Sequence, residues 1–106
     1  MNFQVDSSSI IKNGANWYLH GGNRGDLFAV TAEWCGHCKH LKENVALAQK
    51  QKRFGFYNLD GDANSKLTQL MGIHGYPTCF KIEQGGKLTP YTGDRSTETL
   101  VKEFGN

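Results

Sequence analysis

The sequence predicts an α/β fold, in which a central mixed β-sheet is flanked by helices on both faces. Two apolar runs, over residues 27–32 and 54–60, are bounded by turn residues, as in strands that are buried on both faces. A helical spacing of apolar residues fills the segment between these runs, and strands joined by a helix are expected to be parallel. Two shorter runs after residue 77 predict an antiparallel edge, followed by a closing helix.

The N-terminal segment carries weaker signals than the rest of the chain. Asp6 or Ser7 is a candidate cap for a first helix, although Asn13 and Gly14 disfavour a helix there. Three apolar residues would line the buried side of that helix: Ile10, Ile11 and Trp17. The glycine-rich cluster over residues 21–26 predicts a loop before the first buried strand.

The segment from Gly36 to Arg53 predicts the longest helix. Its apolar positions step by three or four residues, as one stripe of an α-helix requires: Cys38, Leu41, Val45 and Ala48. A shorter helix is expected over residues 64–71, after the second buried strand. Its expected apolar contacts are Leu67, Leu70 and Met71.

The C-terminal part predicts a hairpin and a final helix. Strands over residues 78–83 and 87–91 flank a tight reversal at residues 84–86. Pro90 has no N–H group to donate, so the second of these strands is expected at the edge of the sheet. One face of the closing helix is marked by Leu100, Val101 and Phe104.

Length and composition limit the class of protein. The 106 residues are enough for one domain, which we expect to span residues 1–106. A net charge of +2 is too small to predict binding to nucleic acid or to an anionic membrane. No apolar run is long enough for a membrane-spanning helix, and the first residues do not resemble a secretory signal. Three cysteines, an odd number, do not fit a disulfide framework.

Two of the cysteines, Cys35 and Cys38, lie at the predicted junction between a strand and a helix. Cys35 precedes the first helical turn, where free backbone N–H groups and the positive end of the helix dipole favour a thiolate. Cys38, one turn further, belongs to the apolar stripe and should be less exposed, with a higher pKa. This asymmetry predicts that Cys35 attacks a disulfide and that Cys38 resolves the resulting mixed disulfide.

Two other interpretations of this pair fit the sequence less well. If the two cysteines were ordinary core thiols, their placement at a strand-to-helix junction next to Trp34 would have no explanation. A zinc ion would draw on four side chains of the segment: Cys35, His37, Cys38 and His40. Helical directions send these side chains to different sides, and the remaining candidates form no close pair: His20, His74 and Cys79. We therefore expect neither a metal site nor a cofactor.

The motif Trp34-Cys35-Gly36-His37-Cys38-Lys39 resembles the active site of the thioredoxin superfamily, in the form found in protein disulfide isomerase domains. Ala32-Glu33, just before it, is more similar to thioredoxin itself. Gly72-Ile73-His74-Gly75-Tyr76-Pro77-Thr78 resembles the loop that carries the family's cis-proline. Tyr91-Thr92-Gly93-Asp94-Arg95 resembles the isomerase segment before the last helix. These landmarks follow the family's order and spacing, so the resemblance implies a thioredoxin fold over most of the chain.

The resemblance implies a substrate-binding role for residues around the two sulfurs. Pro77, in a cis peptide, would lie against the sulfurs, and the backbone beside it, with Thr78, would pair with an extended substrate strand. Trp34, Tyr76 and Gly93 would border a shallow apolar patch that receives unfolded or flexible polypeptide. Plain core packing of Trp34 and Tyr76 is the alternative.

The resemblance also implies a catalytic motif in which Gly36 and His37 lie between the two cysteines, and it implies residues that tune the two sulfurs. Arg95 matches an isomerase arginine that would swing toward Cys38 and lower its pKa, and a solvated loop arginine is the alternative. His37, as a cation or hydrogen-bond donor beside Cys35, would stabilise the thiolate and therefore the reduced form. We therefore expect a reduction potential nearer the isomerase value of about −180 mV than the thioredoxin value of about −270 mV.

The sequence departs from the family pattern at two positions. The family keeps a buried acid six residues before the first cysteine, where this chain has Ala29. Isomerase domains often pair that acid with a lysine three residues after the cis-proline, where this chain has Phe80. Both changes together leave no unpaired buried charge. Slower resolution by Cys38 is expected unless His37, Arg95 or water takes over the role of the acid.

These features predict a thiol–disulfide oxidoreductase that exchanges disulfides with protein or peptide substrates. A thioredoxin-type reductase is the alternative within this class, and a non-catalytic peptide-binding module on the same fold is the alternative outside it. We expect a monomer that exchanges electrons with a reductase or an oxidase partner. The expected location is the cytoplasm if the chain is complete, and an oxidising secretory compartment if it is an excised domain. Cys79 is expected in the core, with a regulatory or dimer-forming thiol as the alternative.

Overall fold

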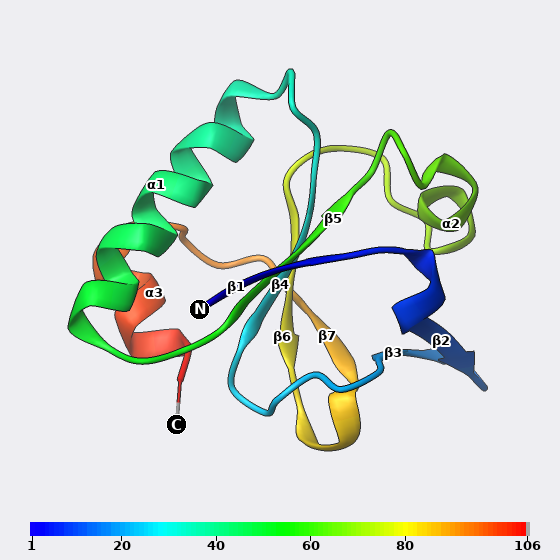
Figure 1. Cartoon of the computed structure of the whole chain (residues 1–106), viewed down its shortest axis with the longest axis horizontal. Helices are drawn as coiled ribbons and strands as arrows, with labels where there is room; N and C mark the ends of the chain where they lie inside the picture. Colours follow the sequence, from blue (N-terminus) through cyan, green and yellow to red (C-terminus); the bar gives the residue numbers. More distant parts are fainter. Residues whose placement is uncertain (106) are drawn as a thin grey trace.

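The computed structural model describes residues 1–105 and is built around a five-stranded mixed sheet (Figure 1). The strand order is β1-β5-β4-β6-β7, with these bounds: β1 Asn2–Val5, β4 Leu27–Thr31, β5 Phe56–Asp60, β6 Thr78–Ile82 and β7 Leu88–Tyr91. β1, β5 and β4 are parallel, whereas β6 and β7 add an antiparallel edge. The predicted mixed sheet is therefore confirmed, and Pro90 lies in its edge strand β7.

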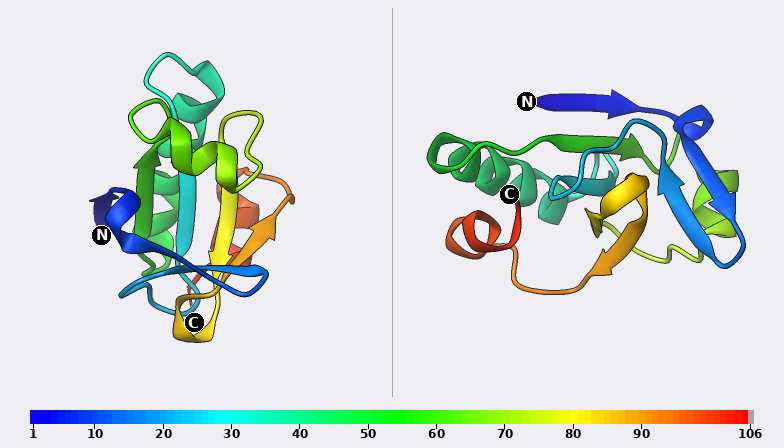
Figure 2. Two further views of the ribbon diagram at one scale, coloured as in Figure 1. Left: turned by 90° about the vertical axis from the view of Figure 1, so that its right-hand side faces the viewer. Right: turned by 90° about the horizontal axis from the view of Figure 1, so that it is seen from below.

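Helices cover both faces of the sheet. α1 (Gly36–Gln51) and α3 (Thr97–Glu103) lie together on one face, while α2 (Ser65–Leu70) lies on the other side, as the views of Figure 2 also show. The predicted α/β fold with helices on both faces is thus confirmed. None of the helices within residues 1–105 has the length and apolar character that crossing a membrane requires.

The core is divided by the sheet, because successive residues of β4 point to opposite faces. Leu27 and Ala29 pack with the buried side chains of α1 and α3, and Phe28 and Val30 pack on the opposite face. All five residues of β4 are buried, as expected for a central strand with both faces covered. The predicted apolar stripe of α1 is confirmed, and so is the packing of Leu100 and Phe104 at the C-terminus.

The prediction of an N-terminal helix is wrong. Asp6 does act as a cap, accepting a hydrogen bond from the Ser8 N–H, but it caps only a short 3₁₀ turn, η1 (Ser7–Ser9). A separate antiparallel hairpin follows, formed by β2 (Ile10–Asn13) and β3 (Asn16–Leu19). Gly14 has φ of +64° and lies between these strands, in a conformation that glycine adopts without strain. Asn13 and Gly14, which disfavour a helix, therefore favour the turn of the hairpin.

Two further details differ from the sequence prediction. β1 was not predicted, because it is short and mostly exposed, and its one aromatic residue, Phe3, stacks on Tyr57 at a ring-centroid distance of 4.7 Å. In α2, Leu67 and Met71 pack against the core as expected, but Leu70 is 67% exposed. Thr68 is the buried residue of α2, so the inward face of the helix is centred between residues 67 and 68, and Leu70 lies at the border of that face, toward solvent.

Candidate functional site

The two neighbouring cysteines lie at the N-terminal end of α1, beyond the carboxyl end of β4. Cys35 is the N-cap of α1, with an extended backbone (φ −86°, ψ 114°), and its Sγ accepts a hydrogen bond from the Cys38 N–H at 3.2 Å. The Cys35 N–H donates in turn to the carbonyl of Ala32 at 3.1 Å, which closes the turn after the strand. The Cys35 sulfur therefore faces the unpaired N–H groups and the positive dipole end of the helix.

Both cysteines are free thiols, but their surroundings differ. Cys35 is 5% exposed and Cys38 1% exposed. Burial raises the pKa of Cys38 to about 11, with the hydrogen bond to Cys35 as a second cause. The positive charge of Lys42 works in the opposite direction and lowers the pKa of Cys38. The burial of Cys38 and its raised pKa are those expected for a residue of the apolar stripe of α1.

The loop before β6 closes over the sulfurs from the other side. The peptide bond between Tyr76 and Pro77 is cis. The Cys35 thiol donates a hydrogen bond to the Tyr76 carbonyl at 3.5 Å, and the half-buried Tyr76 ring packs against the cluster of Ala32, Cys35 and Cys38. The hydroxyl of Thr78 donates to the Gly75 carbonyl at 2.7 Å, within the same loop.

Trp34 is a surface residue, so the alternative that it packs in the core is wrong. Its side chain is 71% exposed, and its ring meets that of Tyr76 edge-on at a centroid distance of 5.9 Å. The indole Nε1–H donates to Asp62 Oδ2 at 2.6 Å, which holds the ring above the surface. A hollow of about 440 Å³ lies beside it, lined by Trp34, Glu33, Asp60 and Asp62.

Asp62 was missed by the sequence analysis, although a signal for it exists. Asp62 comes two residues after the end of β5, next to Gly61. β4 and β5 are parallel neighbours, so the segments after their carboxyl ends meet at the same edge of the sheet. A polar residue just after β5 could therefore have been expected beside the segment that follows β4.

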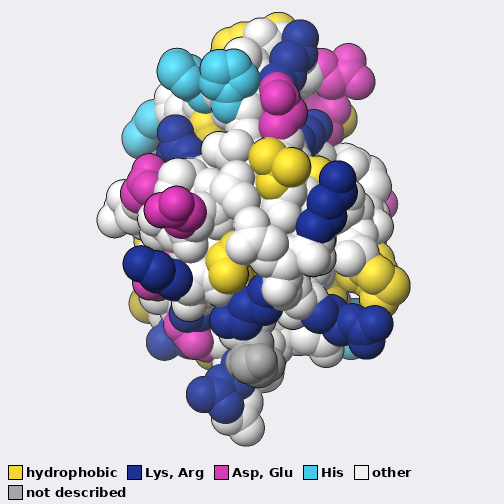
Figure 3. Space-filling view, turned by 90° about the vertical axis from the view of Figure 1, so that its left-hand side faces the viewer, with side chains coloured by type: hydrophobic (Ala, Val, Ile, Leu, Met, Phe, Trp, Pro, Cys, Tyr) yellow, Lys and Arg dark blue, Asp and Glu magenta, His cyan; other side chains and the backbone are white. Residues whose placement is uncertain are grey.

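The surface on the other side of the cysteines is a second hollow, of about 560 Å³, between α1 and the loop that joins β7 to α3. Exposed His37 and His40 on α1 line it together with exposed Gly93 and Arg95 on the loop. Figure 3 shows histidine side chains gathered at the upper end of the face that carries α1. Asn44 ties the loop to α1, because its Nδ2 donates to the Arg95 carbonyl at 2.9 Å.

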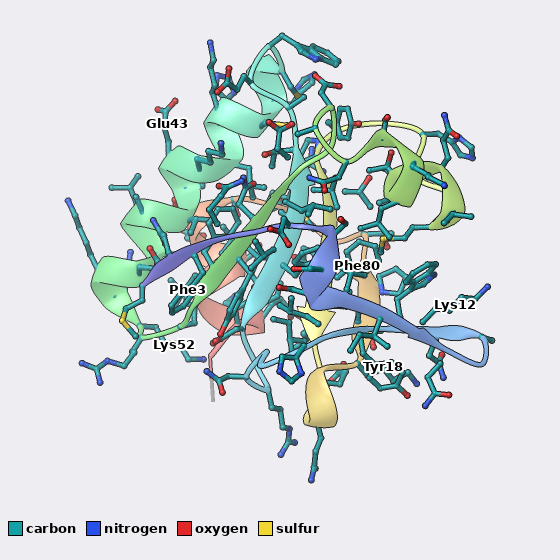
Figure 4. All side chains as sticks on the ribbon, turned by 45° about the vertical axis from the view of Figure 1, so that its right-hand side comes forward. Phe3, Lys12, Tyr18, Glu43, Lys52 and Phe80 are labelled. Atoms are coloured by element: carbon teal, nitrogen blue, oxygen red, sulfur yellow. The ribbon has the colours of Figure 1, made fainter. Side chains whose placement is uncertain are left out.

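The position of the family's buried acid is filled by apolar packing. Ala29 is fully buried, and its partners in the sheet are Asn58 on β5 and Cys79 on β6. Both positions are apolar, as expected, but Phe80 does not face Ala29. Cys79 is the direct β6 partner of Ala29, and Phe80, the next residue of β6, points to the opposite face of the sheet. Phe80 packs with the β2–β3 hairpin on the face away from α1, as the labelled side chain in Figure 4 shows.

The third cysteine, Cys79, belongs to the core cluster beneath α1. Its side chain is 4% exposed, and burial raises its pKa to about 11. The charge of Arg95 lowers the pKa of Cys79, and interaction with Cys38 raises it, so both groups lie within electrostatic reach. This location agrees with the expectation that Cys79 is a core residue.

The side chains weighed as zinc ligands do not converge. Within residues 1–105, no three of the His, Cys, Asp and Glu side chains are placed so that they could hold a metal ion. The two cysteines of the motif are buried, while His37 and His40 are exposed on the surface of α1.

Comparison with known proteins identifies relatives of this chain. The sequence model of the thioredoxin family matches residues 18–105. Protein disulfide-isomerase of Aspergillus niger is 40% identical over 86 residues, which cover 77% of this chain and 16% of that protein. Protein disulfide-isomerase of Medicago sativa is 36% identical over 80 residues, which cover 72% of this chain and 16% of that protein.

A solved structure shows the same fold. A mutant thioredoxin from Halobacterium salinarum NRC-1 superposes with a TM-score of 0.66 at 20% identity, covering 95% of this chain and 85% of the other. The chain spans less than a quarter of the length of the curated relatives it matches.

Proposed function

The chain belongs to the thioredoxin family, with a thioredoxin domain like those of protein disulfide isomerases, and from this we propose that it exchanges disulfides with protein substrates through Cys35 and Cys38. Thiol–disulfide oxidoreduction is the chemistry of the family. One observation carries the proposal: the Cys35 sulfur caps α1 and accepts the Cys38 N–H at 3.2 Å, with the free Cys38 thiol one turn behind it. We further propose that residues 1–106 act as one monomeric domain.

The exchange would proceed in two displacements. The Cys35 thiolate attacks one sulfur of the substrate disulfide, forms a mixed disulfide and releases the other substrate sulfur as a thiolate. The Cys38 thiolate then attacks the Cys35 sulfur and releases the second substrate thiolate. The substrate gains two electrons, and the protein is left with a Cys35–Cys38 disulfide. The same steps in reverse oxidise a substrate dithiol.

A polypeptide substrate would bind across the surface around Cys35. Exposed Trp34 supplies an aromatic face, Tyr76 lies beside it, and Gly93 borders the site from the β7–α3 loop. The backbone next to Pro77 and Thr78 would hydrogen-bond to an extended segment of the substrate. Reductase or oxidase partners would approach the same surface, because they exchange disulfides with the same sulfurs.

The proposal is tested by two assays on the same preparation, namely reduction of insulin disulfides and refolding of a protein with scrambled disulfides. Activity in both supports an isomerase-like oxidoreductase, and activity only in insulin reduction supports a thioredoxin-type reductase. Inactivity in both contradicts the proposal and leaves a peptide-binding module, which the absence of an acid at Ala29 would favour.

The reduction potential should lie nearer about −180 mV than about −270 mV. His37 follows the N-cap by two residues and is exposed, so its imidazole can stabilise a thiolate at Cys35 and with it the reduced form. Replacing His37→Ala should make the potential more negative by about 30 mV or more, a tenfold change in the equilibrium. Titration in glutathione redox buffers measures this, with His40→Ala as the matched control. A wild-type potential below that of thioredoxin would contradict the prediction.

Introducing an acid at position 29 should change turnover. Glutamate in place of Ala29 would place a carboxylate beneath α1 as a proton acceptor for Cys38, and we expect resolution near neutral pH to accelerate by about tenfold or more. The buried carboxyl group should also lower the free energy of unfolding by several kcal/mol. Ala29→Gln is the control of matched size. Equal resolution rates in Ala29→Glu, Ala29→Gln and the wild type would contradict the idea that the missing acid limits the reaction.

A further inference from the structure

A hollow of about 320 Å³ lies where α1 meets the β1 edge of the sheet, away from the exposed surface around Trp34. Gln4 of β1, Asn58 of β5 and both Lys42 and Val45 of α1 contribute to its lining. Lys42 is the one charged residue among the described side chains that line it. Lys42 therefore places a single positive charge at the edge of this hollow, on the exposed flank of the cysteine-bearing helix.

The wall of this hollow adjoins the position where the family has its buried acid. Asn58 is the direct β5 partner of Ala29, and Val45 packs in the same core cluster as Ala29. The Asn58 side chain accepts a hydrogen bond from the Thr31 hydroxyl at 2.6 Å and donates one to Gln4 Oε1 at 3.1 Å. The place of an acid is thus taken by Ala29 with hydrogen-bonded but uncharged neighbours.

Lys42 lies one helical turn after Cys38, on the same side of α1. Residues four apart in a helix have Cβ atoms about 5–6 Å from each other. A helical side chain leans toward the N-terminus, so the Lys42 stem covers the turn that contains Cys38. Lys42 itself is exposed, whereas Cys38 is 1% exposed, so the ammonium group can remain hydrated while its charge acts on the buried sulfur.

We propose that Lys42 is a positioning residue for the second displacement. The buried acid of the family is missing from this chain, and the ammonium charge of Lys42 stabilises the Cys38 thiolate instead. The inference rests on the proposed exchange function. In this step the Cys38 S–H proton passes to water, and the electron pair of the sulfur forms the bond to Cys35. The bond between Cys35 and the substrate sulfur breaks, and that sulfur leaves as a thiolate.

The charged and titratable groups near Cys38 come from three parts of the structure. Cys35 and Lys42 belong to α1, and Cys79 lies on β6, where Arg95 of the β7–α3 loop acts on it. Cys35 raises the pKa of Cys38 and Lys42 lowers it, while the pKa of Cys79 is raised by its interaction with Cys38. β4 and β5 contribute the uncharged Ala29, Thr31 and Asn58 described above.

In the test, the reduced protein reacts with the chromogenic disulfide dithiobis-nitrobenzoate, and the release of coloured thiolate is followed over time. The reactions of the two sulfurs appear as two separate phases. Attack by Cys35 releases the first coloured thiolate, and attack by Cys38 on the mixed disulfide releases the second. A Cys38→Ala variant should lack the second phase, so any further thiolate release from this variant is due to Cys79. The Lys42→Gln variant should slow the second phase by about twofold to fivefold near neutral pH, with the first phase unchanged. Lys42→Glu should slow it further, and Lys42→Arg should restore it.

The pH profile identifies the cause. Without the Lys42 charge the pKa of Cys38 rises, so the second phase of Lys42→Gln should reach its maximum at higher pH than that of the wild type. High salt should shrink the difference, because it screens an exposed charge. Lys50→Gln, at the far end of α1, is the charge-matched control. A second phase in Lys42→Gln with the wild-type rate and pH profile would overturn the inference, while a wild type without any second phase would instead contradict the exchange function.

Discussion

Replacing Cys38 by serine should stop turnover and trap substrates as mixed disulfides on Cys35. The variant keeps the attacking sulfur at the helix N-cap but lacks the thiol that releases the substrate. Its turnover in insulin reduction should fall by at least about a thousandfold, as expected when a nucleophile is removed from a two-step exchange. Mass spectrometry of the unreduced protein should detect the covalent adducts.

Cys35→Ser is the matched comparison for this experiment. It should lose turnover to the same extent but form no mixed disulfide through the motif, because Cys38 is 1% exposed and its pKa is raised to about 11. Cys79→Ala should retain turnover, because Cys79 is a core residue outside the proposed exchange. Trapping by Cys35→Ser and none by Cys38→Ser would reverse the roles assigned to the two sulfurs.

Phe104→Ala should cause one of the largest losses of stability among single core substitutions. Phe104 is fully buried at the end of α3, and its ring lies 5.2 Å from that of Tyr91 and 6.0 Å from that of Phe54. Truncating a buried phenylalanine lowers the free energy of unfolding by about 3–5 kcal/mol. Because small domains are stable by only about 5–15 kcal/mol, the midpoint of urea unfolding should shift strongly.

Leu70→Ala is the control for this prediction. Leu70 is 67% exposed, so its truncation should change the free energy of unfolding by less than about 0.5 kcal/mol. Equal destabilisation by Phe104→Ala and Leu70→Ala would contradict the description of the core. The pair also tests a point on which the sequence was misleading, because the apolar pattern of residues 64–71 predicts that Leu70 is buried.

The elements that could be predicted from sequence are those with a strong local pattern. The apolar run of β4 and the three- and four-residue spacing in α1 are independent of the rest of the chain, and both are confirmed. The β6–β7 hairpin is marked by two consecutive glycines. Gly86, with φ of +89°, also approaches the Leu19 carbonyl too closely for a Cβ atom, so this position needs glycine for two reasons.

The elements that were missed have weak local patterns. The segment after Asp6 has residues that can belong to a helix or to a hairpin, and pairing of Ile10 with Leu19 decides for the hairpin. β1 has little apolar character of its own and exists because β5 offers it a partner along four residues. Both outcomes depend on contacts between segments, which a local pattern does not contain.

The pairing of Cys35 and Cys38 was determined by the sequence itself, because two residues separated by one helical turn meet wherever the helix forms. Their unequal environments also follow from local position, with one sulfur at the helix cap and the other in the apolar stripe. The surroundings of the pair were decided by the tertiary structure. Parallel pairing of β4 and β5 brings Asp62 to Trp34 and Asn58 to Ala29, and packing of α1 on that sheet adds Lys42 beside Asn58. These contacts join residues far apart in the chain, because strand register and helix packing, rather than spacing in the sequence, set the distances between them.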